Sequence, residues 1–77
     1  MMDEIFKMLE EIRPEFDFRN SENFIEDGFL DSFDIVALVD MLEEKYGVKI
    51  DGLDIVPENF SGAGQILALM RKSGATV

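Results

Sequence analysis

The segment from residue 32 to residue 46, SFDIVALVDMLEEKY, constrains the fold most, because its apolar residues recur at the spacing of an α-helix. At about 100° per residue, Ile35, Leu38, Val39, Leu42 and Tyr46 lie on one arc of that helix. Gly47 follows directly and suits the left-handed backbone that ends many helices. We therefore predict a helix over 32–46 with one face buried in a core.

Two further segments predict helices. Apolar residues at helical spacing from Ile5 to Ile12 indicate a first helix over about 3–13, with Asp3 as N-cap and Pro14 ending it. Near the other end, Ser61 is expected to cap a last helix, and Gly74 to terminate it. The apolar residues of that last helix are Ala63, Ile66, Leu67, Leu69 and Met70.

Between the predicted helices lie two less regular stretches. Residues 14–31 have no sustained periodicity but contain four phenylalanines, which we expect to pack over the helices. Pro57 suits the first position of a short helical turn that reaches Phe60. The prediction is one all-α domain over 1–77, a small four-helix bundle with a long first loop and a short third helix.

Composition excludes several classes of function. The chain of 77 residues has no Cys and no His, which removes disulfides, thiolate nucleophiles, zinc-finger ligation and the usual neutral-pH acid–base group. The net charge of −10, from 17 acidic and 7 basic residues, repels nucleic acid and favours partners with basic surfaces. Asp27, Asp31 and Asp34 lack the spacing of an EF-hand calcium loop. We expect no enzyme activity, no catalytic residue and no metal site.

No stretch approaches the ~20 apolar residues of a membrane span, and the N-terminal MMDEIF lacks the basic start of a signal peptide. We therefore expect a cytoplasmic protein. Nothing in the sequence indicates self-association, so a monomer is expected.

The candidate site is Asp31-Ser32, where the long loop meets the predicted helix over 32–46. A helix N-terminus offers free backbone N–H groups and a partial positive charge, so a phosphate on Ser32 would be favoured there. A purely structural interpretation is also open. Asp31 as N-cap and Asp34 three residues later resemble a capping box with Asp in place of Glu.

The predicted helix over 32–46 has a second face, partly apolar and edged with carboxylates. Next to a presented serine, such a face indicates docking of a basic partner. An alternative is that the long loop covers part of it. The docking residues predicted on this helix are Phe33, Asp34, Val36, Ala37, Asp40, Met41, Glu43 and Glu44.

From Asn23 to Tyr46, NFIEDGFLDSFDIVALVDMLEEKY, the chain resembles acyl carrier proteins, and a weaker similarity covers nearly its whole length. The family signature is Asp-Ser-Leu or Asp-Ser-Met at the start of helix two, and here it reads Asp31-Ser32-Phe33. The later IVPENF is similar to the approach to the short third helix of these carriers. The GFLDS approach resembles stand-alone aminoacyl carriers such as D-alanyl carrier proteins, and specialised polyketide or secondary-metabolite carriers are the alternative.

This resemblance implies that Ser32 receives 4′-phosphopantetheine from coenzyme A through a magnesium-dependent phosphopantetheinyl transferase. Asp31 would orient the serine, and Phe33 would be a docking residue. The arm would carry acyl or aminoacyl groups as thioesters between a loading ligase and downstream acyl-transfer enzymes. The alternative is a non-covalent interaction module of the same fold in which Ser32 remains unmodified.

Overall fold

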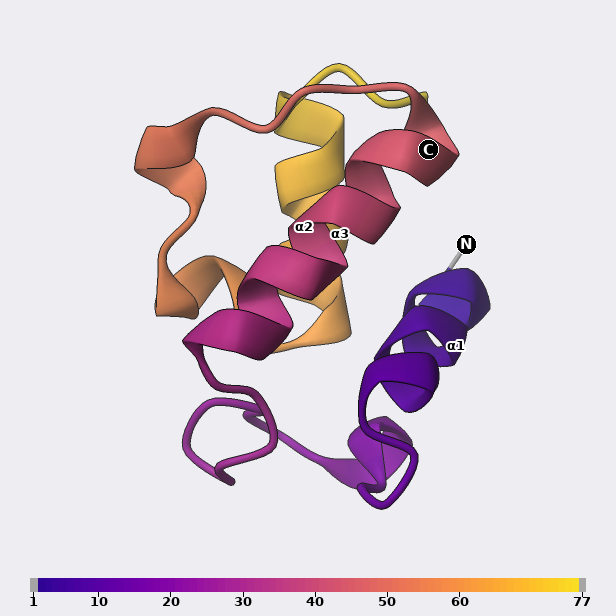
Figure 1. The fold of residues 1–77 in the computed structure, drawn as a ribbon, viewed down its shortest axis with the longest axis vertical. Helices are drawn as coiled ribbons and strands as arrows, with labels where there is room; N and C mark the ends of the chain where they lie inside the picture. Colours follow the sequence, from indigo (N-terminus) through magenta and orange to yellow (C-terminus); the bar gives the residue numbers. More distant parts are fainter. Residues whose placement is uncertain (1, 77) are drawn as a thin grey trace.

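The computed structural model describes residues 2–76, which form three α-helices and three short 3-10 helices (Figure 1). No strand occurs within this range. The short third helix that we predicted is a single 3-10 turn, so the described chain has three α-helices rather than four. In chain order the elements are α1 (Met2–Ile12), η1 (Phe18–Asn20), α2 (Ser32–Tyr46), η2 (Gly52–Asp54), η3 (Pro57–Phe60) and α3 (Ala63–Lys72).

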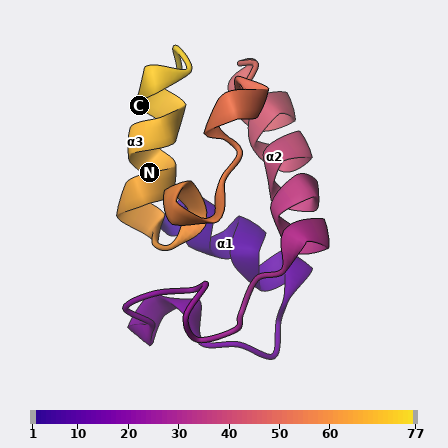
Figure 2. The same cartoon turned by 90° about the vertical axis from the view of Figure 1, so that its left-hand side faces the viewer.

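The helices are arranged so that α1 packs against both α2 and α3 (Figures 1 and 2). In both views α2 and α3 run in the same direction, away from the end of the molecule where residues 14–31 lie. The segment after α2 returns towards that end through η2 and η3 before α3 begins. The loop–helix junction at Ser32 is therefore at the loop end of the molecule.

The core is built from the apolar faces of the three helices. Fully buried side chains come from each of them, because every helix places its apolar residues three or four positions apart. The predicted buried arc of α2 is confirmed for four of its five members, and Tyr46 lies half-buried at its edge. The side chains with no exposed surface are Ile5, Leu9, Phe18, Leu38, Leu42, Phe60, Ile66 and Met70.

The loop phenylalanines pack against one another and extend the core of the three helices. Phe18 lies at its centre, with edge-on contacts to Phe24 at 5.1 Å and to Phe29 at 5.4 Å between ring centroids. Phe16 stacks on Phe29 at 4.5 Å. Such aromatic pairs add stability beyond the burial of their surface. The prediction that these side chains pack inward is confirmed, and their packing orders a long loop.

Some of the helix ends that we predicted from the sequence match the structure, and others do not. Gly47 has the predicted left-handed backbone, with φ of 65°. Two predicted N-caps are wrong. Because α1 already includes residue 2, Asp3 lies inside it and pairs with Arg19 at 2.8 Å. Gly62, not Ser61, precedes α3, and the Ser61 hydroxyl instead donates to the carbonyl of Glu58.

Candidate functional site

The first turn of α2 presents Ser32 to solvent. Asp31 is the N-cap, and its carboxylate accepts a hydrogen bond from the Asp34 N–H at 2.9 Å. The Asp34 carboxylate accepts in return from the Asp31 N–H at 3.0 Å, which completes the predicted capping box. Ser32 is the first residue of the helix and is exposed. Its side chain is therefore accessible to solvent at the capped start of α2.

Arg13, which the sequence analysis did not identify as a site residue, connects this turn to the end of α1. Its Nε donates to both carboxylate oxygens of Asp34, at 3.0 and 3.1 Å. Its terminal nitrogens reach Asp31 at 3.4 Å and Glu15 at 3.5 Å. A basic residue at the end of the first predicted helix, in so acidic a chain, was the available signal. Its partner lies 21 residues away, and no local pattern reveals it.

These contacts set the protonation states around Ser32. The N–H of Asp34 is the main cause that lowers the pKa of the Asp31 carboxyl, with Arg13 adding to the effect. The hydrogen bond to Asp34 raises the pKa of Arg13 above its ordinary value. At neutral pH the first turn of α2 therefore combines an ionised Asp31 with a guanidinium next to it.

The outer face of α2 is free of the loop. Phe33 is 85% exposed and Val36 is 58% exposed, so the alternative in which the loop covers this face does not hold for them. Ala37, Asp40 and Glu44 are also exposed. The face predicted for docking is therefore accessible over most of its length.

Three of the predicted docking residues are buried or half-buried, unlike the rest. The prediction that Asp34 is a docking residue is corrected by the structure. Its side chain is only 8% exposed, and its carboxylate oxygens accept hydrogen bonds from Arg13 and from the Asp31 N–H of the capping box. Glu43 is half-buried, and its carboxylate accepts from the N–H of Ile50 at 2.8 Å. Met41 is half-buried against the core on the side of α1. Two of these carboxylates thus have structural roles.

An apolar groove adjoins Ser32 on the side of α2 that faces η3. Its volume is about 250 Å³. Val36 is the member on the exposed face of α2, and Pro57 comes from η3. The sequence analysis did not connect these segments, because the contact depends on how the chain returns after α2. The lining residues are Ile25, Leu30, Asp31, Ser32, Ile35, Val36, Ile55 and Pro57.

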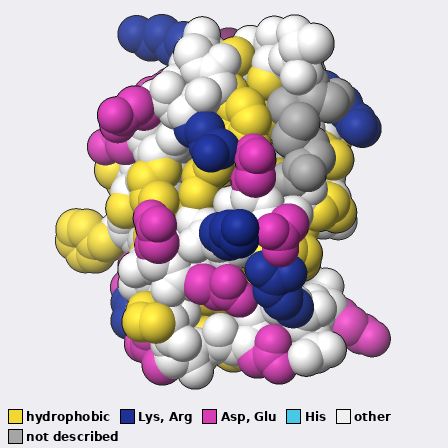
Figure 3. All heavy atoms as spheres, turned by 90° about the vertical axis from the view of Figure 1, so that its right-hand side faces the viewer, with side chains coloured by type: hydrophobic (Ala, Val, Ile, Leu, Met, Phe, Trp, Pro, Cys, Tyr) yellow, Lys and Arg dark blue, Asp and Glu magenta, His cyan; other side chains and the backbone are white. Residues whose placement is uncertain are grey.

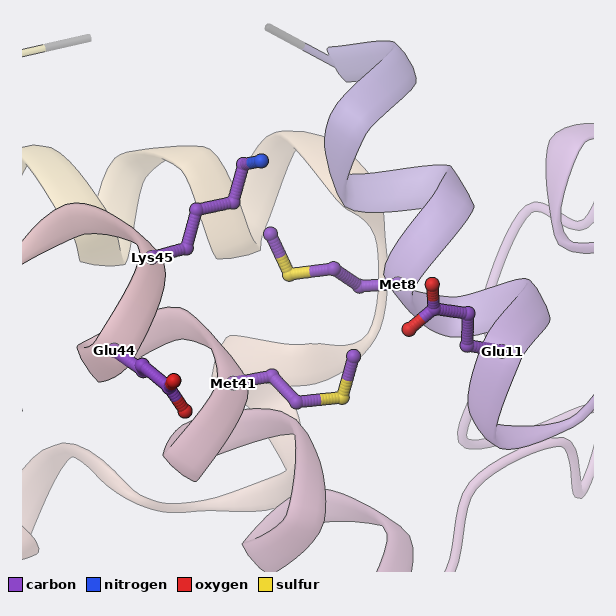
Figure 4. A pocket seen from close by; sticks show the side chains of 5 residues that line it. All are labelled: Met8, Glu11, Met41, Glu44 and Lys45. Atoms are coloured by element: carbon purple, nitrogen blue, oxygen red, sulfur yellow. The ribbon is translucent and has the colours of Figure 1, made fainter.

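A second groove lies where α1 meets α2, on the side of the molecule on which basic and acidic side chains intermingle with hydrophobic ones (Figure 3). Met8 and Met41 point towards one another across it, and Glu11, Glu44 and Lys45 complete its lining (Figure 4). Its volume is about 310 Å³. We call it the α1–α2 groove.

Within residues 2–76, no three His, Cys, Asp or Glu side chains are placed to hold a metal ion together, and none of the helices has the length and apolar character of a membrane span. Comparisons of the chain with protein-family models, with curated proteins and with solved structures found no match.

Proposed function

We propose that this protein is a carrier that holds acyl or aminoacyl groups as thioesters on a 4′-phosphopantetheine arm attached to Ser32. The observation that carries the proposal is the exposed hydroxyl of Ser32 on the first residue of the longest helix, in the Asp-Ser sequence shared with acyl carrier proteins. The partial positive charge at this helix end favours a phosphodiester there. In this proposal η3 takes the place of the short third helix of a four-helix carrier.

The residues around Ser32 fit such an arm. The apolar groove beside the serine, with Val36 and Pro57 at its edge, offers a surface for the arm's carbon chain. The ionised Asp31 next to it supports the role of orienting the serine or contacting the transferase's magnesium ion. When attached, the arm supplies the thiol that a chain without Cys lacks.

Partners in this proposal are a phosphopantetheinyl transferase, a loading ligase and acyl-transfer enzymes with basic docking surfaces. Phe33 and Val36 would supply apolar contact, while Asp40 and Glu44 would attract the basic surface. Ala37, Met41 and Glu43 would contribute at the edges. A cytoplasmic monomer is part of the same proposal.

A second function is favoured by one observation. The capping box accounts for Asp31 without any modification of Ser32, because the side chains of Asp31 and Asp34 stabilise the start of α2. The same exposed face would then belong to a non-covalent interaction module with an unmodified Ser32.

The measurement that separates the two is intact mass after incubation with coenzyme A, magnesium and a broad-specificity phosphopantetheinyl transferase. The carrier gains one phosphopantetheine group, and Ser32→Ala does not. Because Ser32 is exposed, the variant is expected to fold normally, which circular dichroism checks. No gain with several transferases would leave the interaction module as the function.

A further inference from the structure

The contact between α1 and α2 is polar at both ends and open in the middle. At one end Arg13 binds Asp34. At the other, Glu4 accepts from the Tyr46 hydroxyl at 3.2 Å and lies 4.0 Å from Nζ of Lys45. The α1–α2 groove lies between these two attachments, so the contacts at its ends fix its width.

Two methionines give this groove an apolar and adaptable lining. Met8 is 7% exposed and Met41 is half-buried, and their thioethers come from opposite walls (Figure 4). Methionine is unbranched and polarisable, so a pair of methionines can adjust to side chains of different shape. The volume of about 310 Å³ is at the lower limit for small-molecule sites, and the groove is open to solvent. It suits a side chain that projects from a partner.

The groove is also lined by acidic residues whose carboxylates are not used within the fold. Glu11 and Glu44 line it, and neither carboxylate makes a hydrogen bond or an ion pair with any residue in 2–76. Asp40, one turn before Glu44, has no such partner in that range either. Asp40 and Glu44 are four positions apart on α2, and two like charges at this spacing destabilise a helix slightly. By contrast, the acids at the ends of the α1–α2 contact are paired with cations.

We propose that the α1–α2 groove binds a helix of a partner protein that carries one apolar side chain flanked by Arg or Lys. The apolar side chain lies between Met8 and Met41, and the basic residues face Glu11 and Glu44. Lys45, held by Glu4, keeps cations away from one end and so sets the direction of the partner helix. A second copy of this chain is a poor occupant, because each copy has a net charge of −10. The proposal does not depend on an arm at Ser32.

The test uses the full, unmodified chain labelled with ¹⁵N and a short helical peptide with one Leu between Arg residues four positions on either side. We expect a dissociation constant of the order of 100 μM, with shifted amide signals concentrated at residues 8, 11, 41 and 44. Matched peptides replace Arg by Glu or Leu by Ala, and both should bind at least about tenfold more weakly. No transferase is involved, so the result is independent of whether Ser32 is modified.

Three protein variants complete the test. Glu44→Lys and Met41→Gln should each weaken binding about tenfold while leaving the circular dichroism spectrum unchanged. Glu22→Lys makes the same charge change on the exposed loop, outside the groove, and should weaken binding only about twofold. An equal loss in Glu22→Lys and Glu44→Lys, shifts outside the groove, or a dissociation constant above about 1 mM would overturn the proposal.

Discussion

Nε of Arg13 lies 3.1 and 3.0 Å from the two carboxylate oxygens of Asp34, and this fork joins the end of α1 to the first turn of α2. Asp34 is nearly buried, yet both of its oxygens have hydrogen-bond donors. Hydrogen bonds between ionised groups are stronger than neutral ones. The position of Ser32 in the fold is thereby tied to α1 as well as to its own helix.

Replacing Asp34 should test this relationship. Asp34→Ala removes the acceptor of both Arg13 and the Asp31 N–H, so we expect the free energy of unfolding to fall by about 1–3 kcal/mol. Urea unfolding followed by circular dichroism measures it. Glu15→Ala is the control, because Glu15 contacts the same arginine only at 3.5 Å on the surface and should cost less than about 0.5 kcal/mol. Equal losses in the two variants would contradict the assignment.

Asp31 should make stability depend on pH. Because folding lowers the pKa of its carboxyl below the ordinary value of 3.8, its charge stabilises the native state fully at pH values well above 3.8. That contribution is lost as the pH falls below 3.8 and through the lower folded pKa. Asp31→Asn keeps a good N-cap but removes the charge, so wild type should be more stable than the variant at pH 7 and equal to it well below pH 3.8.

Urea unfolding of both proteins across this pH range measures the difference. Asp40→Asn removes the same charge from an exposed position of α2 with no hydrogen-bond or ion-pair partner in residues 2–76. It controls for the general effect of lowering a net charge of −10. A difference between wild type and Asp31→Asn that stays constant with pH would show that the carboxylate charge has no role in the cap.

The aromatic cluster should be a major source of stability for the loop. Phe18 is fully buried among three other rings, so Phe18→Ala is expected to cost about 3–5 kcal/mol of unfolding free energy. Phe33→Ala removes the same side chain from a position that is 85% exposed and should change stability by less than about 0.5 kcal/mol. Thermal unfolding compares them, and similar losses would mean that the loop cluster is not a core.

At the C-terminal end of α2, glycine is needed at position 47 because of its backbone conformation and not because a side chain would be crowded. An alanine Cβ at Gly47 would meet nothing within 4 Å, but φ there is +65°. Gly47→Ala should therefore cost about 1–2 kcal/mol through backbone strain alone. Gly52 is equally uncrowded and lacks a positive φ, so Gly52→Ala should be neutral or slightly stabilising. Chemical unfolding of both variants checks the contrast.

Local features of this chain could be predicted well. The bounds of the helix over 32–46, the left-handed Gly47 and the Asp31–Asp34 capping box match the structure. Each depends on residues within about one turn of one another, so spacing along the chain is enough. Two N-caps were predicted wrongly, because α1 begins before Asp3 and Gly62 rather than Ser61 precedes α3.

The sequence by itself thus determined an all-α chain with a serine presented at the start of its longest helix, because helical periodicity and capping are short-range properties. Only the tertiary structure decided what surrounds that serine. Arg13 approaches Asp34 across 21 positions, and Pro57 and Val36 line the same groove beside Ser32. Met8 and Met41 face one another only because α1 packs on α2. Such contacts depend on how helices cross in space, which no spacing within one helix encodes.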